Sequence, residues 1–166
     1  MNLEEWNERY RSREELDHEP ASLLVTAALS LPPGRALDLA CGAGRNAVWL
    51  AERGWEVVAI DGASEAIRIV REQDPGIDAR VLDLETGDPL PFDDETFDLV
   101  AILFFLHPSL FAEAKRLVRR GGIVVAAARM SGTFAIAPGE IGAHFEGFEI
   151  IHERESEIAE LIARKR

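Results

Sequence analysis

The chain has 166 residues, 47% of them hydrophobic, with 18 basic and 30 acidic residues that give a formal net charge of −12. This length is typical of one domain with its own core. The negative charge repels nucleic acid backbones and anionic lipid surfaces, so neither is an expected partner. The first residues lack a secretion signal pattern, and the longest apolar run, 99–106, is too short to span a bilayer. We therefore expect a cytoplasmic protein. One cysteine and no His/Cys cluster predict neither a disulfide nor a metal site.

Helical patterns open the chain. Asn2 and Glu5 have the spacing of a capping box at the start of a short amphipathic helix. Pro20 suits the first turn of a second helix, which the residues 32–34 should end.

From residue 35 onward, strand and helix patterns alternate. The expected strands are 35–40, 55–60, 77–83, 97–105, 123–128 and 148–153. The expected helices are 44–53, one capped by Ser64, one opened by Pro108 and one turn near Gly139. The last segment, 157–166, fits a helix slightly better than a strand. This alternation predicts a single α/β domain with a doubly wound, mostly parallel sheet and helices on both faces.

Ligands of such sheets bind beyond the carboxyl ends of the strands, which directs attention to the turn after the first strand. Gly42, Gly44 and Ala47 there satisfy the dinucleotide fingerprint G-x-G-x-x-A, and Asp61 ends the second strand. One hypothesis is therefore an NAD-dependent oxidoreductase. Asp38 disfavours it, because a carboxylate would face the pyrophosphate at close range. The chain is also too short for the usual substrate domain, whereas a ligand with a cationic amino acid end would be attracted by Asp38.

The segments "LDLACGAG", "VVAID", "VLDL" and "FDLVAIL" resemble the class I S-adenosylmethionine-dependent methyltransferases over nearly the whole chain. The longer stretch "ALDLACGAGRNAVWLAERGW", together with "APGEI", is similar to a small bacterial branch related to tellurite-resistance and thiopurine methyltransferases. The resemblance implies a Rossmann-like, seven-stranded sheet of order 3-2-1-4-5-7-6. Its antiparallel seventh strand would have to come from the last segment, and a helical last segment would leave six strands.

The cofactor implied is S-adenosylmethionine, with S-adenosylhomocysteine as product. Glycines in the turn allow close backbone approach, Asp61 can accept both ribose hydroxyls, and Asp83 with the Leu84 N–H can hold adenine. The expected cofactor-binding residues are Asp38, Ala40, Gly42, Gly44, Arg45, Asn46, Asp61, Gly62, Asp83, Leu84 and Tyr10. Local roles stay open as alternatives: a plain turn for the glycines, helix capping for Asp61, Arg45 and Asn46, and the start of a loop for Asp83.

Two segments are expected to flank the reactive methyl group: an N-terminal lid, 1–19, that carries Tyr10, and an acceptor-side loop, 129–146. His107, at the end of the fourth strand, is the candidate general base, and the alternative is a residue that opens the helix at Pro108. Phe104 and Glu140 are candidate substrate contacts, although helix capping explains Glu140 equally well. Amphipathic packing is the alternative for Tyr10. Cys41 fits a small buried residue of the turn rather than a nucleophile.

Methyl transfer needs mainly a nucleophile held close to the methyl carbon, so no catalytic side chain is obligatory. The acceptor is expected to be a small molecule, a thiol, chalcogen oxyanion, amine or hydroxyl. The sequence "FFLHP" stands where many DNA and protein amide methyltransferases have (N/D)PPY, and this difference disfavours amine groups of macromolecules as acceptors. The expected assembly is a monomer or homodimer. The alternative is a noncatalytic cofactor-binding sensor or partner subunit, which a pocket blocked by Phe104, Phe105 or the N-terminal helix would favour.

Overall fold

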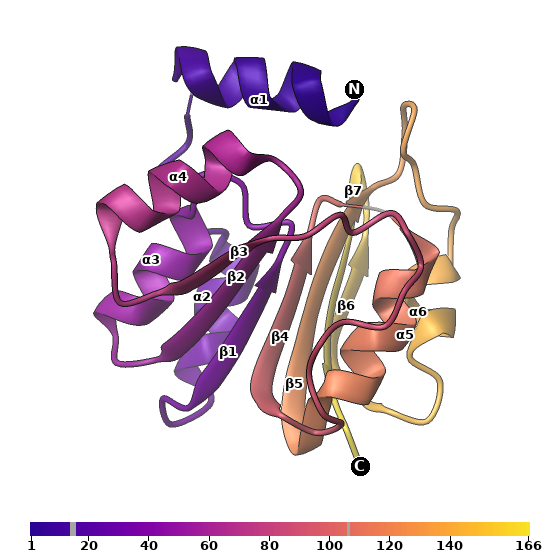
Figure 1. Cartoon of the computed structure of the whole chain (residues 1–166). Coiled ribbons are helices and arrows are strands. Elements are labelled where there is room, and N and C mark those ends of the chain that lie inside the picture. The colour runs from indigo at the N-terminus through magenta and orange to yellow at the C-terminus, as the bar shows by residue number, and fades with distance from the viewer. Residues whose placement is uncertain (14–15, 106) are drawn as a thin grey trace.

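The computed structural model of the chain describes residues 1–13, 16–105 and 107–166. Residues 14 and 15 of the expected lid segment and Leu106 of "FFLHP" lie outside the described residues. The strands are β1 (Arg35–Leu39), β2 (Glu56–Asp61), β3 (Asp78–Val81), β4 (Phe97–Leu103), β5 (Val118–Arg129), β6 (Glu149–Glu155) and β7 (Ile158–Arg164). They form one sheet of order β3-β2-β1-β4-β5-β7-β6 (Figure 1). The predicted fold class and strand order are confirmed.

Strands β1 to β5 run parallel, whereas β7 is antiparallel to both β5 and β6. The helices are α1 (Leu3–Ser12), α2 (Ser22–Leu29), α3 (Arg45–Glu52), α4 (Ser64–Gln73), α5 (Pro108–Leu117) and α6 (Glu140–His144). Helices α2, α3 and α4 cover one face of the sheet, and α5 and α6 cover the other (Figure 1). Among the described residues, no helix has the length and apolar character needed to cross a membrane.

The central strand β4 explains why the sheet is buried on both sides. Its apolar residues alternate between the two cores: Leu99 and Ala101 pack toward α2–α4, while Val100 and Ile102 pack toward α5. A continuous apolar run is what a parallel strand covered on both faces requires. The predicted central strand is confirmed.

The helical preference of the last segment is wrong. Residues Ile158–Arg164 form β7, which pairs with β5 on one side and β6 on the other. Its central position satisfies backbone hydrogen bonds along both edges, and this tertiary pairing overrides the local pattern. The antiparallel seventh strand implied by the family resemblance is confirmed.

The helix starts differ from expectation in two places. The capping box of Asn2 and Glu5 is present at α1, as predicted. Pro20, however, precedes α2, which begins at Ser22 after the N-cap Ala21. Ser64 is the first residue of α4 rather than its cap, because the N-cap position is Ala63.

Candidate functional site

The turn between β1 and α3 is built from left-handed backbone conformations. The φ angles of Ala40, Gly42 and Gly44 are 57°, 56° and 93°. A Cβ atom at Gly42 would lie 3.0 Å from the Tyr10 hydroxyl oxygen, and one at Gly44 would lie 2.9 Å from a methyl carbon of Val70. Glycine therefore avoids φ strain at both positions, and a Cβ there would require Tyr10 or Val70 to shift. Ala40 adopts the same region without being glycine, which no sequence pattern signals.

Gly44→Ala is expected to destabilise the protein by about 1–3 kcal/mol, because left-handed φ strain and the Val70 contact add up. Denaturant unfolding measures this loss. Gly87→Ala is the matched control: Gly87 also has a left-handed φ, of 78°, but a Cβ there would have nothing within 4 Å among the described residues. Its loss should be about 1 kcal/mol or less, from φ strain alone. Equal losses in the two variants would contradict a steric role for Val70.

Asp61, at the end of β2, is held by two backbone donors. Its Oδ2 accepts from the Gly42 N–H at 2.9 Å, and its Oδ1 accepts from the Ala63 N–H at 2.9 Å. Burial raises the pKa of Asp61, and these N–H donors counteract part of that rise. A carboxylate oxygen can accept more than one hydrogen bond, so both oxygens retain capacity for a ligand hydroxyl.

Asp38 is a buried carboxylate next to this cluster. Its side chain is 1% exposed, and Oδ2 has no hydrogen-bond partner in the part of the chain that the structure describes. Burial and the charge of Asp61 raise the pKa of Asp38 to about 7, while Arg45 acts in the opposite direction. A buried acceptor without a donor is costly unless a cationic ligand compensates it.

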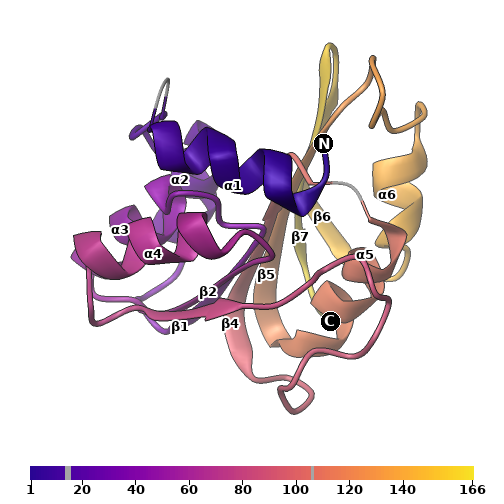
Figure 2. The same cartoon turned by 45° about the horizontal axis from the view of Figure 1, so that its top comes forward.

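Helix α1 lies across the carboxyl edge of the sheet, above the β1–α3 turn and beside α4 (Figures 1 and 2). The Tyr10 hydroxyl lies over Gly42, and a Leu3 methyl carbon is 2.8 Å from where a Cβ of Gly62 would be. The Trp6 ring stacks on Tyr10 with centroids 5.9 Å apart. Burial, and then Asp61 and Cys41, raise the pKa of Tyr10. The N-terminal helix therefore packs over the candidate site, and its contact with a ligand remains a prediction.

Arg45 and Asn46 make contacts that differ from both alternatives considered for them, cofactor binding and local helix capping. The Arg45 guanidinium donates to the Asp17 carboxylate at 3.0 Å and to the Glu19 carbonyl at 3.1 Å. Asn46 Oδ1 accepts from the Ala21 N–H at 2.8 Å. Both side chains therefore hold the connection between α1 and α2 against the start of α3. These partners are 25 to 28 residues away in sequence, so local capping could not have predicted them.

The adenine-side residues lie at the end of β3. Asp83 is exposed and accepts from the Glu85 N–H at 2.9 Å, which is the local turn considered as its alternative. Leu84 is buried in the core on the α5 face. The Leu82 N–H donates to the Asp61 carbonyl at 3.1 Å, so this segment adjoins the Asp61 end of β2. An adenine contact of Asp83 remains a prediction.

On the acceptor side, Phe104 follows β4 with a φ of 64° and an exposed ring. Its N–H donates to the Ala127 carbonyl at 2.7 Å. His107 is the N-cap residue of α5, and its Nδ1 is 2.6 Å from the Ser109 hydroxyl oxygen. Glu140 accepts from the Ala137 N–H at 2.7 Å, at the start of α6. The structure therefore brings Phe104 and His107 to the carboxyl end of β4, whereas Glu140 serves a local turn.

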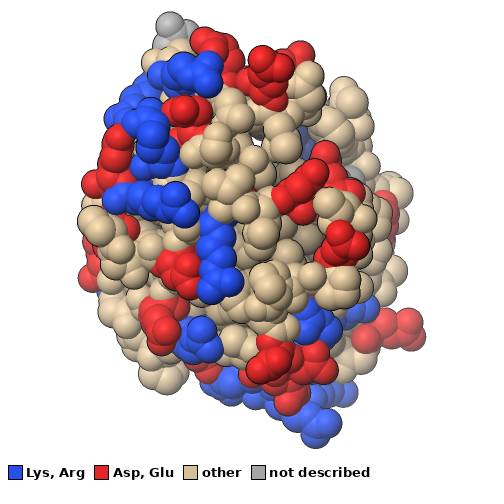
Figure 3. Space-filling view, in the orientation of Figure 1, with Lys and Arg blue, Asp and Glu red and all other residues tan. Residues whose placement is uncertain are grey.

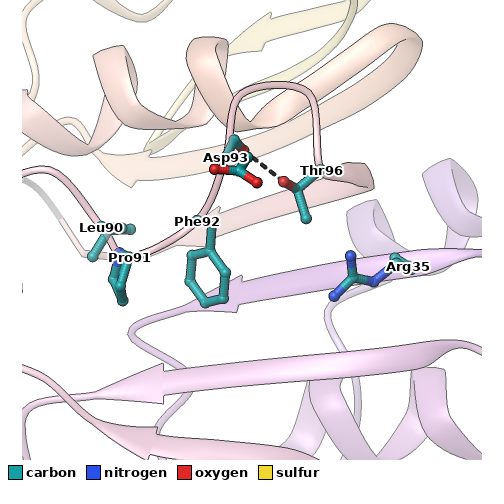
Figure 4. A pocket seen from close by; sticks show the side chains of 6 residues that line it. All are labelled: Arg35, Leu90, Pro91, Phe92, Asp93 and Thr96. Carbon is teal, nitrogen blue, oxygen red and sulfur yellow. Dashed lines mark hydrogen bonds between the residues drawn. The ribbon is translucent and has the colours of Figure 1, made fainter.

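A separate hollow of about 500 Å³ lies at the amino ends of β1 and β4, away from the glycine turn. Figure 4 shows its lining side chains, which come from the start of β1 and from the segment before β4. They are Arg35, Leu90, Pro91, Phe92, Asp93 and Thr96. None of these residues belongs to the predicted site, because parallel strands place ligands at their carboxyl ends and this hollow faces the amino ends.

Residues 37–126, more than half of the chain, match the family described as "Methyltransferase domain". The chain belongs to this methyltransferase family. The family prediction is confirmed, and with it the family-level expectation of S-adenosylmethionine as cofactor.

Among curated relatives, this chain is 33% identical over 117 residues to the demethylmenaquinone methyltransferase of Renibacterium salmoninarum. This match covers 68% of the chain and 48% of the relative, so the chain spans about half the length of that relative. Among solved structures, TehB from Haemophilus influenzae gives a TM-score of 0.82 at 21% identity, over 96% of this chain and 67% of that one. A TehB-like SAM-dependent methyltransferase from Corynebacterium glutamicum gives 0.76 at 21%, over 99% and 98%. This structural similarity shows the fold.

Proposed function

We propose that this methyltransferase transfers a methyl group from S-adenosylmethionine to a small-molecule acceptor. The observation that carries the proposal is the buried Asp38 carboxylate at the glycine turn, whose Oδ2 has no hydrogen-bond partner among the described residues and whose pKa Asp61 raises further. Membership of the family and the likeness to a structure described as SAM-dependent support the same cofactor.

The residues present fit this cofactor. An ammonium group would compensate the buried charge of Asp38, and a phosphate would be repelled by Asp38 and Asp61 together. Asp61 has its carboxylate oriented by Gly42 and Ala63, so it is preorganised to accept ribose hydroxyls. The dinucleotide alternative lacks any comparable basic group for its pyrophosphate in this turn except Arg45, which already binds Asp17.

When bound, S-adenosylmethionine supplies a methyl carbon on a sulfonium centre that leaves as a neutral thioether. The protein's contribution is then to fix the reactants and to exclude water. Helix α1 supports the second role, because Tyr10 and Leu3 cover Gly42 and Gly62. The hydrogen bond between His107 Nδ1 and the Ser109 hydroxyl orients the imidazole at the carboxyl end of β4. We propose His107 as the general base for acceptors that must lose a proton.

A small-molecule acceptor is supported by the name of the relative, a demethylmenaquinone methyltransferase, and by the exposed Phe104 ring at the acceptor side. The net charge of −12 argues against nucleic acid. Figure 3 shows acidic and basic side chains interspersed over the face drawn in Figure 1, with basic ones both at the upper left, over α1 and α4, and at the bottom, near the C-terminus. We infer one domain with a lid segment at 1–19 and an acceptor-side loop at 129–146, in a cytoplasmic monomer or homodimer.

Calorimetric titration with S-adenosylhomocysteine and, separately, NADH tests the cofactor. We expect micromolar binding of S-adenosylhomocysteine and none of NADH. NADH binding alone would overturn the proposal in favour of an oxidoreductase. Binding of S-adenosylhomocysteine, followed by no methylation of thiol, chalcogen oxyanion, amine or hydroxyl acceptors, would favour the noncatalytic sensor.

A further inference from the structure

Helix α4 begins without a side chain of its own that can cap it. Its N-cap position is Ala63, whose methyl group accepts no hydrogen bond. The first N–H groups of a helix need acceptors from outside the helix, and an N-cap side chain normally supplies one to the second or third residue. In α4 that acceptor comes from elsewhere in the chain.

Asn7, in the middle of α1, supplies it. Asn7 Oδ1 accepts from the Glu65 N–H at 3.0 Å and from the Ser64 hydroxyl at 3.4 Å. Glu65 is the second residue of α4, the position that an N-cap side chain would serve. The contact spans 58 residues of sequence. A side chain of one helix thus replaces the missing cap of another.

The segment capped in this way also carries the expected ribose acid. Asp61 ends β2, its Oδ1 accepts from the Ala63 N–H, and α4 starts at the next residue. Leu3 of α1 packs on Gly62, between Asp61 and Ala63. The same five-residue stretch, 61–65, therefore holds the candidate cofactor carboxylate and the docking point of α1.

Besides Asn7, α1 is held by the packing of Leu3 on Gly62 and of Tyr10 over Gly42, and by an ion pair at its far end. Every residue of α1 is exposed or half-buried. At its far end Arg13 pairs with Glu72 of α4, through side chains that are about half exposed. Figure 3 shows this side of the molecule as a mixture of basic and acidic side chains over α1 and α4. Exposed ion pairs of this kind contribute little, whereas Asn7 makes directed hydrogen bonds to the start of α4.

We propose that Asn7 is a positioning residue that seats α1 on the start of α4 and so places Tyr10 over the glycine turn, which strengthens cofactor binding. The proposal rests on the proposed function, because it concerns the same cofactor site. Asn7 acts through the position of Tyr10 and through the segment 61–65, and it is assigned no contact with the cofactor.

The test compares Asn7→Ala and Asn7→Asp with the wild-type protein. Hydrogen exchange of α1 peptides in the ligand-free protein measures the seating, and the Kd for S-adenosylhomocysteine measures its effect. Alanine favours a helix more than asparagine does, so a purely local effect would slow exchange in α1. Loss of the seat should instead make exchange about fivefold faster and raise the Kd about fivefold. Asn7→Asp keeps the acceptor at a helix N-terminus and should restore both values to within about twofold.

Arg13→Ala is the control for general loosening between α1 and α4, and it should change the Kd less than about twofold. Unchanged or slower exchange in Asn7→Ala would overturn the seating role. Faster exchange with an unchanged Kd would overturn its link to the cofactor. If the wild-type protein failed to bind S-adenosylhomocysteine, the proposed function and that link would fall together, while the exchange data would still decide the seating.

Discussion

Replacement of Asp61 by alanine is expected to raise the Kd for S-adenosylhomocysteine at least about 100-fold, because the proposed pair of charge-assisted hydrogen bonds from its carboxylate to the ribose would be lost. The structure adds a second reason. Asp61 also fixes the Gly42 and Ala63 N–H groups at 2.9 Å each, so its loss releases the turn on one side and the start of α4 on the other. Calorimetric titration measures the change.

Asp61→Asn separates these two contributions. The amide keeps one oxygen acceptor, but its NH₂ group would meet one of the two backbone N–H donors that the carboxylate now satisfies. We expect an intermediate loss of about tenfold or more. Asp88→Ala, at an exposed position in the loop after β3, is the matched control and should leave the Kd unchanged. A Kd within about threefold of wild type for Asp61→Ala would exclude Asp61 as the ribose acceptor.

Much of the fold could be predicted because the parallel strands are short apolar runs between clear turn residues. The burial of β4 on both faces follows directly from a sequence with no polar residue between Leu99 and Leu103. The last strand could not be predicted in this way. In "IAELIAR" the apolar residues satisfy both a helical and a strand period, and only the open edges of β5 and β6 decide between them.

In the candidate site, too, contacts within one local unit could be predicted, whereas contacts between distant segments could not. Gly42, Gly44 and Asp61 lie within one strand–helix–strand unit, so their spacing alone brings them together, and Asp61 does bind the Gly42 N–H. The contacts of Asn7, and of Arg45 with Asp17, join separate units through side chains of common type. No local pattern distinguishes such residues from other polar residues on a helix surface. The left-handed conformations of Ala40 and Phe104 likewise have no sequence signal, since neither is glycine.

Asp38→Asn is expected to stabilise the ligand-free protein at pH 8 by roughly 2–4 kcal/mol, because it removes a buried charge that the described chain leaves without a partner on Oδ2. The pKa of Asp38 is raised by burial and by Asp61 to about 7, from 3.8. The folded protein therefore keeps this proton between pH 3.8 and about 7 while the unfolded chain has lost it. Stability of the wild-type protein should consequently fall as the pH rises through this window, and the Asp38→Asn substitution should remove the contribution of Asp38 to that slope. Urea unfolding at several pH values measures both effects.

The same substitution should have the opposite effect on the ligand. Only the ionised Asp38 attracts an ammonium group, so wild-type affinity for S-adenosylhomocysteine should increase as the pH rises through about 7. Binding near pH 6 should release a proton, which titration in two buffers of different ionisation enthalpy detects. In Asp38→Asn the affinity should be more than about tenfold weaker at pH 8 and without the increase near pH 7.

Two charged groups act on Asp38: Asp61 raises its pKa and Arg45 lowers it. Burial, and then Asp38, raise the pKa of the Cys41 thiol. Asp61 is stabilised as a carboxylate by backbone donors, whereas Asp38 Oδ2 has no donor among the described residues, so Asp38 is the carboxyl that keeps its proton to higher pH. A ligand-free stability that does not change between about pH 5 and 8 would contradict this assignment. Asp38→Asn is thus expected to give a more stable protein that binds its cofactor less well. This combination is expected of a buried carboxylate whose charge is compensated by a cationic ligand and not by the fold.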